Sequence, residues 1–385
     1  MAESSAFITP FTVNISNGEV EDLRRRLRDA RWPDQPSGIG WSQGTDLGYL
    51  RGLVEYWRSS FDWPAFEARL NSYPQYTTLI DGVSIHFYHV PSAVPDARPL
   101  LLLHGWPSSP FEFTGLIDRL SNPVAHGGRS EDAYHLVIPS LPGFGFSGPT
   151  TMTGLTPMGI ADRFAELMTR LGYARFFSHG GDFGAIVSGH LARRYSDRVM
   201  GVHLTFLTTA GLRPEDGEPT ALEKRLHDQQ AAYARWETGY ISIQSTKPQT
   251  LAYGLCDSPV ALAAWLVEKF RAWTENDGNV ETGLSRDEIL TIVSTYWLTG
   301  TAGSAARLYY ETGAAGQFGP SPHRIEVPTA IAMPPFEPYR TTRRMAEHHA
   351  NIVNWVDLPN GGHFSALEQP ELVASAIAEG LRDLG

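Results

Sequence analysis

His179-Gly180-Gly181-Asp182-Phe183-Gly184 is the stretch that decides the fold of this chain. It has the small–x–nucleophile–x–small arrangement of a sharp turn that joins a strand to a helix and exposes one reactive side chain. The glycines two positions to either side of Asp182 allow backbones to approach where a Cβ atom would collide. Residues 174–178 have the character of a short buried strand, and residues 185–192 can form a helix. The stretch therefore predicts a strand, a turn and a helix, with Asp182 at the tip of the turn.

The central residue of this turn is aspartate, not serine. A carboxylate is a poor nucleophile toward amides and esters at neutral pH, but it can displace a leaving group from an sp³ carbon and form an ester intermediate. This chemistry favours cleavage of a C–O or C–halogen bond over the reaction of a peptidase or lipase. The alternative is a glycine-rich turn in which Asp182 only caps the helix.

Two other motifs compete for the interpretation of the chain. Asp182-Phe183-Gly184 spells the metal-binding tripeptide of protein kinases, but neither a His-Arg-Asp loop nor a Val-Ala-Ile-Lys strand is present. Gly143-Phe144-Gly145-Phe146-Ser147-Gly148 matches the dinucleotide fingerprint and follows a strand-like run. Because Pro149 and two threonines follow at once, no helix is expected whose N-terminus could meet a pyrophosphate. Both interpretations are disfavoured.

Composition and charge exclude several classes of protein. The chain has 385 residues, of which 42% are hydrophobic, so it can bury a large core. The net charge of −11 argues against binding of nucleic acid or of an anionic membrane as the main task. The single cysteine, Cys256, cannot form an internal disulfide or a zinc site alone, which is typical of the reducing cytoplasm. Met1–Ser5 is too polar to begin a signal peptide, and no run reaches the ~18–20 apolar residues of a membrane span. A cytoplasmic location is therefore expected.

The first part of the chain predicts a helical segment and a hairpin. Apolar residues recur at helical spacing in 19–30, 50–57 and 61–70, which predicts three amphipathic helices. This segment is too apolar on one face to be a free tail, so we expect it to wrap the main domain. Two strand-like runs, 76–80 and 83–88, are joined by Asp-Gly, the preferred hairpin turn.

The remainder predicts an α/β fold. Apolar runs without polar alternation, at Leu100–Leu103, His135–Pro139, Phe176–Ser178 and Val202–Leu207, indicate a mostly parallel sheet covered on both faces. Strand-like runs return at 327–332 and 352–356, after a helical block that we expect to lie over the strand ends as a lid. The predicted divisions are residues 1–95 for the leader and first hairpin, 96–207 for the first part of the core, 208–317 for the lid and 318–385 for the second part of the core.

The other expected catalytic parts follow predicted strands. The turn His104-Gly105-Trp106-Pro107 could place the N–H of Trp106 beside that of Phe183, and together they would form an oxyanion hole. Glu337 follows one late strand, and His363, within Asn360-Gly361-Gly362-His363-Phe364, follows the last. Asp182, Glu337 and His363 then occur in the chain order nucleophile, acid, base of the α/β-hydrolase fold. The alternatives are a surface carboxylate for Glu337 and an ordinary loop histidine for His363.

Taken together, these motifs resemble those of the microsomal-type epoxide hydrolases. The likeness runs from Pro10-Phe11 and Arg31-Trp32-Pro33 to Gly361-Gly362-His363-Phe364. It is carried by further stretches as well: His104–Pro107, Gly180–Gly184, Gly239–Gln244 leading into Thr246-Lys247-Pro248, Asp257-Ser258-Pro259 with Leu262-Ala263-Ala264, and Arg307–Tyr310. The chain is also similar to actinobacterial epoxide hydrolases of enediyne antibiotic biosynthesis. The membrane-anchoring segment of the vertebrate enzymes is missing, so a soluble protein is expected.

The resemblance implies roles that the residues alone do not give. Tyr240 and Tyr309 would be the lid tyrosines that hold and protonate the epoxide oxygen, with Tyr310 an adjacent rival for the second. Trp106, Phe183 and Trp236 are expected to line the substrate pocket. The expected partners are a small epoxide, hydrophobic and aryl-bearing, and water, with no metal or organic cofactor. A homodimer is compatible with the sequence.

Three functions stay open at this point. The first is an epoxide hydrolase that forms a diol through an aspartyl ester. The second is a haloalkane dehalogenase, which shares the aspartate but needs halide-binding N–H donors, a role for which Trp106 is suited, in place of lid tyrosines. The third is a hydrolase fold that binds a ligand without turnover.

Overall fold

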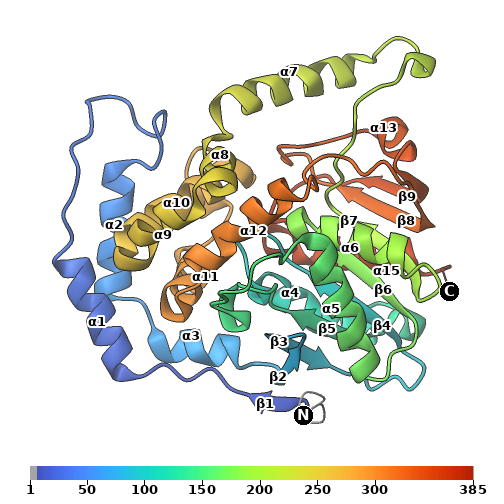
Figure 1. Ribbon diagram of the computed structural model, residues 1–385, viewed down its shortest axis with the longest axis horizontal. Helices are drawn as coiled ribbons and strands as arrows, with labels where there is room; N and C mark the ends of the chain where they lie inside the picture. The colour runs from blue at the N-terminus through green and yellow to red at the C-terminus, as the bar shows by residue number, and fades with distance from the viewer. Residues whose placement is uncertain (1–6, 385) are drawn as a thin grey trace.

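The computed structural model describes residues 7–384, and the polar opening Met1–Ser5 lies outside the described residues. Its centre is a nine-stranded sheet in the order β1-β2-β3-β5-β4-β6-β7-β8-β9 (Figure 1). Strands β4 to β9 run parallel to one another, whereas β1, β2 and β3 pair antiparallel, and β3 joins the parallel part by pairing antiparallel with β5. The strands are β1 (Thr9–Phe11), β2 (Gln75–Ile80), β3 (Val83–Val90), β4 (Arg98–Leu103), β5 (Tyr134–Pro139), β6 (Phe176–Gly180), β7 (Val199–Leu204), β8 (Ile325–Met333) and β9 (Ala350–Asp357).

The sheet is covered on both faces, as its unbroken apolar runs predict. In β4, Leu101 and Leu103 belong to one buried cluster, and the alternate Leu100 and Leu102 belong to the other. Helices α5 (Pro157–Arg170) and α6 (Asp182–Arg194) pack with the first cluster, and α4 (Thr114–Ser121) and α15 (Pro370–Leu381) pack with the second. This two-sided burial is the physical reason why these strands have no polar face.

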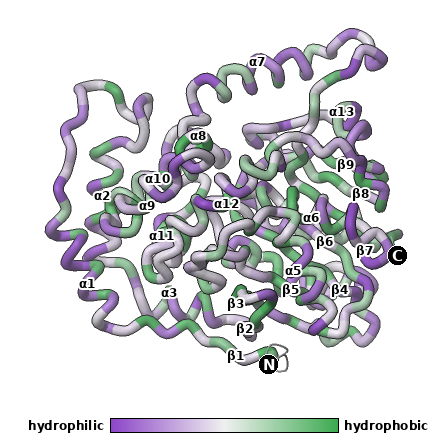
Figure 2. The backbone as a smooth tube through the Cα atoms, viewed as in Figure 1, coloured by the Kyte–Doolittle hydropathy of each residue, from purple (hydrophilic) through white to green (hydrophobic). Residues whose placement is uncertain are grey.

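The N-terminal segment contacts the lid as well as the sheet. It forms α1 (Asn17–Arg28), α2 (Leu47–Ser59) and α3 (Trp63–Leu70), so the three predicted helices are confirmed. Buried Trp57 donates its indole N–H to Ser294 in the lid at 2.9 Å, and Tyr56 donates to Asp287 at 2.9 Å. Strand β1 completes the edge of the sheet. Helix α1, which carries many charges, is mostly hydrophilic along its length (Figure 2).

Between β7 and β8 the chain forms a helical lid over the strand ends (Figure 1). Its helices are α7 (Ala221–Trp236), α8 (Gly239–Thr246), α9 (Pro248–Asp257), α10 (Pro259–Trp273), α11 (Arg286–Thr299) and α12 (Ala302–Ala314). Short helices α13 (Arg343–Glu347) and α14 (Ser365–Glu368) lie in the second part of the core. No single helix within residues 7–384 is long and apolar enough to cross a membrane, and α9 with α10, bent by 116°, meets that test only as a pair.

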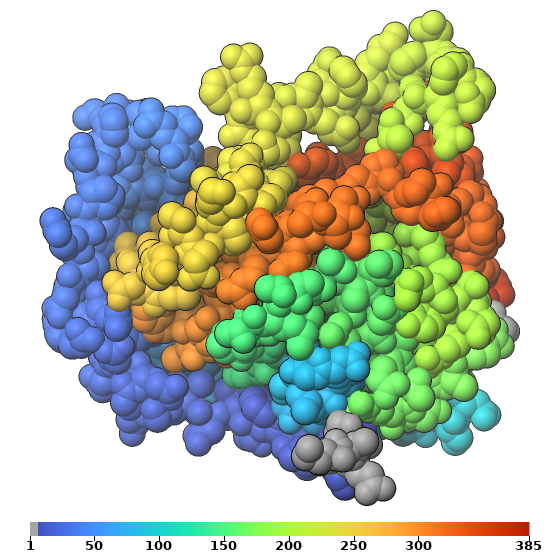
Figure 3. All heavy atoms as spheres, in the orientation of Figure 1, coloured from blue at the N-terminus to red at the C-terminus, as the bar shows by residue number. Residues whose placement is uncertain are grey.

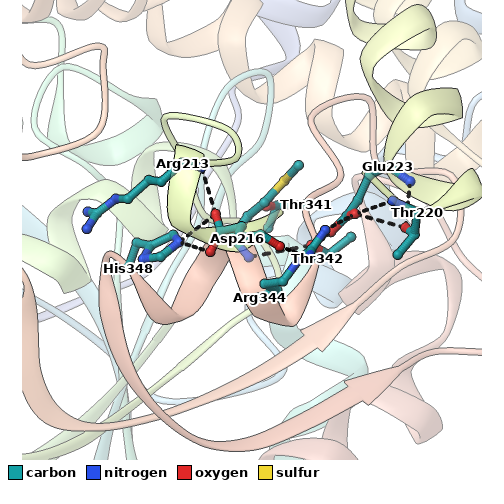
Figure 4. A network of polar contacts seen from close by, with 9 residues as sticks. Arg213, Asp216, Thr220, Glu223, Thr341, Thr342, Arg344 and His348 are labelled. Atoms are coloured by element: carbon teal, nitrogen blue, oxygen red, sulfur yellow. Dashed lines mark hydrogen bonds and ion pairs between the residues drawn. The ribbon is translucent and has the colours of Figure 1, made fainter. Parts of the chain in front are cut away.

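Polar contacts fasten the start of α7 to the core (Figure 4). Both carboxylate oxygens of Asp216 lie 2.9 Å from His348 Nε2. Glu223, buried near the start of α7, accepts hydrogen bonds from Arg344 and from Thr342 on the core side. Although burial opposes it, the hydrogen bonds from Thr220 and Arg344 lower the pKa of Glu223 to about 2. The carboxylate is therefore charged and links lid to core.

The glycine-rich run 143–148 does not form a dinucleotide site. It contains a single 3₁₀ turn, Gly145–Ser147, and the next helix, α5, begins only at Pro157. A pyrophosphate would find no helix N-terminus directly after these glycines.

Candidate active site

The predicted sharp turn lies between β6 and α6, and its glycines are required by contact. Asp182 has a φ of 46°, in the left-handed region that most side chains avoid. A Cβ atom at Gly180 would lie 2.3 Å from the carbonyl carbon of Gly184, and one at Gly184 would lie 1.9 Å from the oxygen of Leu103. At Gly105 a Cβ atom would come within 2.2 Å of the Asp182 carboxylate. Only glycine at these positions lets the turn present its aspartate.

A backbone N–H group contacts the Asp182 carboxylate at the start of α6. The N–H of Trp106 donates to Asp182 Oδ1 at 2.8 Å. Asp182 is the first residue of α6 and Phe183 the second, so the carboxylate lies at the positive end of the helix dipole, among N–H groups without partners inside the helix. Trp106 thus contacts the carboxylate through its N–H, and Phe183 follows Asp182 in the first turn of α6. The oxyanion hole formed by these two N–H groups stays a prediction.

His363 lies between two carboxylates. Its Nδ1 is 2.7 Å from Glu337 Oε2, and its Nε2 is 3.4 Å from Asp182 Oδ2. Glu337 follows β8 and His363 follows β9, so all three side chains meet at the carboxyl ends of parallel strands. Burial alone would lower the pKa of His363, but the negative charges of Glu337 and Asp182 raise it well above its ordinary value. The geometry is that of a nucleophile, a base and an orienting acid.

A buried carboxyl group positions the loop that carries His363. Glu368 accepts hydrogen bonds from the N–H groups of Gly362 (3.0 Å) and Phe364 (3.1 Å), on either side of the histidine, and from Glu275 in the lid (2.7 Å). Burial raises the pKa of Glu368 to about 7. The His363 N–H donates to the carbonyl of Trp273 at 2.8 Å, so the loop is fixed against the lid.

Aromatic side chains form the cavity above Asp182. The cavity has a volume of about 290 Å³, and both Tyr240 and Tyr309 line it together with Asp182 and His363. The ring of Tyr240 is stacked on Trp106 with centroids 5.2 Å apart, and the ring of Tyr309 meets Phe183 edge to face at 4.9 Å. Burial, with a smaller contribution from the Asp182 charge, raises the pKa of both tyrosines well above 10. Both hydroxyls are therefore protonated donors.

The structure separates three of the expected residues from this cavity. Trp106 was expected to line the pocket, but its ring is stacked on Tyr240 and is not among the residues that line the cavity. Tyr310, the rival of Tyr309, is 45% exposed on the outer face of α12. The expectation that Trp236 lines the pocket is wrong, because its side chain is 73% exposed and borders a different groove. On α7, Leu226, Gln230 and Tyr233 form the inward stripe at helical spacing. Position 236 lies off that stripe, at the last residue of the helix.

Several cavity residues were not expected from the sequence. Tyr233 and Tyr339, with ring centroids 5.1 Å apart, line the cavity along with Trp273, Phe206 and Phe318. The inward spacing on α7 is a signal that could have selected Tyr233 over Trp236. For the others we find no local signal, because each comes from a different segment.

A larger cavity borders the first one. It has a volume of about 810 Å³, lies beneath α7 and shares Thr208, Phe318 and Tyr339 with the smaller cavity. Figure 3 shows the hollow between α7 and the rest of the molecule. This arrangement gives a route from solvent toward Asp182.

Within residues 7–384, no cluster of three or more His, Cys, Asp or Glu side chains is arranged to hold a metal ion. The expectation that the chemistry needs neither metal nor organic cofactor stays a prediction.

The strand order, the turn at Asp182 and the chain order of the three catalytic candidates define an α/β-hydrolase. Residues 98–251 match the family described as alpha/beta hydrolase fold, and residues 8–113 match the family described as Epoxide hydrolase N terminus. The chain is 35% identical to epoxide hydrolase 1 of Sus scrofa, covering 96% of this chain and 87% of that protein. A protein of Stigmatella aurantiaca is 44% identical over 98% of this chain and 85% of its own length.

Two solved structures support the same conclusion. The juvenile hormone epoxide hydrolase of the silkworm Bombyx mori superposes with a TM-score of 0.90 at 30% identity, covering 97% of this chain and 94% of that chain. The Aspergillus niger epoxide hydrolase gives a TM-score of 0.87 at 31% identity, covering 99% of this chain and 98% of that chain. The chain belongs to the epoxide hydrolase family and is an epoxide hydrolase. Family membership favours this function over the dehalogenase and the binding protein.

Proposed function

We propose that the enzyme opens its epoxide by attack of Asp182 on a ring carbon. The new bond joins a carboxylate oxygen to carbon, the epoxide C–O bond breaks, and its electron pair goes to the epoxide oxygen. An alkoxide is a poor leaving group, so a proton must reach that oxygen as the bond breaks. Tyr240 and Tyr309 supply the donor hydroxyls. The observation that carries this proposal is that Asp182 and both tyrosines line one small cavity.

The second half-reaction hydrolyses the ester. His363, oriented by Glu337, removes a proton from water, and the hydroxide adds to the Asp182 carbonyl carbon. The N–H groups of Trp106 and Phe183 stabilise the resulting oxyanion. Collapse breaks the ester C–O bond, and His363 returns the proton taken from water to the departing alkoxide, which leaves as the diol. The second proton of the water, left on the Asp182 carboxyl group, restores the tyrosine hydroxyl and regenerates the carboxylate. Esterification removes the negative charge of Asp182, one of the two charges that raise the pKa of His363. The histidine therefore becomes a better candidate for a neutral base once the ester exists.

The cavity walls favour a hydrophobic, aryl-bearing epoxide as the substrate. Tyr240, Tyr309 and Phe183 line the cavity, with ring centroids 4.9–5.8 Å apart, and aromatic walls of this kind pack well against a further aromatic ring. The similarity to enediyne-pathway enzymes motivates a role in antibiotic biosynthesis. A cytoplasmic location and a homodimer remain predictions from the sequence.

A single-turnover experiment tests the covalent mechanism. Excess enzyme is mixed with styrene oxide in ¹⁸O-labelled water, and diol and protein are analysed by mass spectrometry. Because the first oxygen comes from Asp182, the diol should be unlabelled and the label should enter the aspartate. Labelled diol from the first turnover would mean direct attack by water and would contradict the proposal. Chiral analysis of diols from aryl and alkyl epoxides then tests the substrate class.

A further inference from the structure

A buried lysine lies against Tyr240 from outside the active-site cavity. Lys269, on α10, has a side chain that is only 5% exposed. Its Nζ lies 4.7 Å from the centroid of the Tyr240 ring and 5.6 Å from that of Trp273. It lines the groove between the N-terminal segment and the lid, which also reaches Tyr240, and it is not among the residues around the 290 Å³ cavity. The ammonium group can therefore influence the substrate only through residues of the cavity wall, and Tyr240 is the nearer of the two aromatic rings that it contacts.

The neighbours of Lys269 are consistent with a charged ammonium group. Its Nζ lies 2.7 Å from Glu268 Oε2 and 3.6 Å from Glu237 Oε2. It also donates to the backbone carbonyl of Glu237 at 3.3 Å, where α7 ends and the helix dipole is negative. Buried lysines are costly unless they are paired in this way. The lysine is thus held in place by one carboxylate beside it on α10 and by the end of α7.

Ring opening of the epoxide creates negative charge on Tyr240 that this cation can stabilise. As Tyr240 donates its proton, negative charge develops on the phenolic oxygen and spreads into the ring. A cation over the ring is attracted by the ring quadrupole before the reaction and is attracted more strongly once the ring carries charge. An interaction that strengthens in the transition state increases the rate. Resting on the proposed role of Tyr240, we propose that Lys269 is a positioning residue that makes this tyrosine a better proton donor in the ring-opening step.

The alternative is that Lys269 only holds α7, α8 and α10 together. A double-mutant cycle separates the two roles, with ester formation and ester hydrolysis measured separately by rapid quench and tryptophan fluorescence. Lys269→Met keeps the aliphatic stem and removes the charge. We expect it to slow ester formation roughly 2- to 30-fold and to leave ester hydrolysis unchanged, while Lys269→Arg restores most of the rate.

The decisive measurement is the effect of Lys269→Met on ester formation in variants that lack one of the two tyrosine hydroxyls. In Tyr240→Phe, Lys269→Met should cause no further loss, because the hydroxyl through which it acts is gone. In Tyr309→Phe the full loss should remain. Lys247→Met, which removes an exposed lysine at the end of α8, should have no effect in any background. Lys269→Gln retains a donor to Glu237 and takes the place of Lys269→Met if that variant fails to fold.

Two results with the lysine variants would overturn this inference. One is a loss of rate in Lys269→Met or Lys269→Gln that affects both half-reactions or that persists undiminished in the Tyr240→Phe background. A purely structural role of Lys269 predicts both of these outcomes. The other is ring opening that is unchanged without the charge although Tyr240→Phe is impaired, in which case the proposed function stands and only the lysine is excluded. If Tyr240→Phe itself is silent, the donor assignment fails and this inference fails with it.

Discussion

The active site has two halves that are built in different ways. Asp182, Glu337 and His363 lie on short loops at the ends of parallel strands, where glycines with no room for a Cβ atom fix the backbone. Tyr240 and Tyr309 project from lid helices and are placed by packing of aromatic rings. In the proposed mechanism, the half at the strand ends supplies the groups that form and break the ester, and the lid half supplies protons. The difference suggests that damage to each half should slow a different chemical step.

The largest effect is expected at the nucleophile. Asp182→Ala removes the atom that bonds to the substrate, so turnover should fall on the order of 10⁶-fold, as for a nucleophile removed from a comparable catalytic unit. Steady-state diol formation measures it, and thermal unfolding checks that the fold is intact. Substantial residual turnover would show that water attacks the epoxide without Asp182.

The next largest loss of turnover is expected at His363, the proposed base. His363→Gln should still allow alkylation of Asp182 but stall hydrolysis, with a loss of roughly 10²–10⁴-fold in turnover. The intact-protein mass should therefore rise by the mass of the epoxide. Glu337→Gln should slow the same step less, because it orients the imidazole without transferring a proton itself. Preserved activity with no trapped adduct would remove His363 from this role.

The same residue gives the expected pH dependence. In the aspartyl ester the charge of Asp182 is gone, so Glu337 is the carboxylate that still raises the pKa of His363, and only the neutral imidazole can accept a proton from water. Ester hydrolysis should therefore slow as pH is lowered through the histidine pKa and reach a plateau at higher pH. Stopped-flow measurements from pH 5 to 9 test the sign, and a hydrolysis rate that rises as pH falls would contradict it.

Intermediate effects are expected in the lid half. General-acid assistance is worth roughly 10²–10⁴-fold and two donors share it, so Tyr240→Phe and Tyr309→Phe should each cost part of that range. The double variant should nearly abolish ester formation, with no effect on ester hydrolysis. Tyr310→Phe, on the exposed face of α12, is the matched control. If Tyr310→Phe is impaired and Tyr309→Phe is silent, the donor is the neighbouring residue.

These two halves also differ in how far the sequence predicts them. A strand followed by a glycine-rich loop predicts the location of Asp182 and His363 at the strand ends, because backbone sterics act locally. Tyr240 and Tyr309 were identified only by family resemblance, since helix positions facing a cavity depend on distant packing. Trp236 was misplaced because resemblance alone did not establish which face of α7 points inward. Strand β7 ends at Leu204, three residues before the end of the apolar run that predicted it, and the last two residues of that run, Phe206 and Leu207, line the cavities instead.

The smallest effect on chemistry is expected where the two halves are joined, at Glu223. Glu223→Gln weakens the contacts with Arg344 and Thr342 (Figure 4) and should lower the free energy of unfolding at pH 7 by about 1–3 kcal/mol. Ester formation should change by less than about threefold, because none of the groups that react is touched. Thermal unfolding and the rate of ester formation measure the two consequences.

Lowering the pH should remove the contribution of the Glu223 charge to the free energy of unfolding of the wild-type enzyme. Folding lowers the pKa of Glu223 from 4.5 to about 2, so its contribution, up to about 3 kcal/mol, is complete above pH 4.5 and is lost as pH falls toward 2. The stability difference between wild type and Glu223→Gln should therefore shrink across this window. A difference that stays constant from pH 7 to 2 would mean that the Glu223 charge does not hold the lid to the core. The contacts in Figure 4 would then be incidental to the placement of α7 over the cavity.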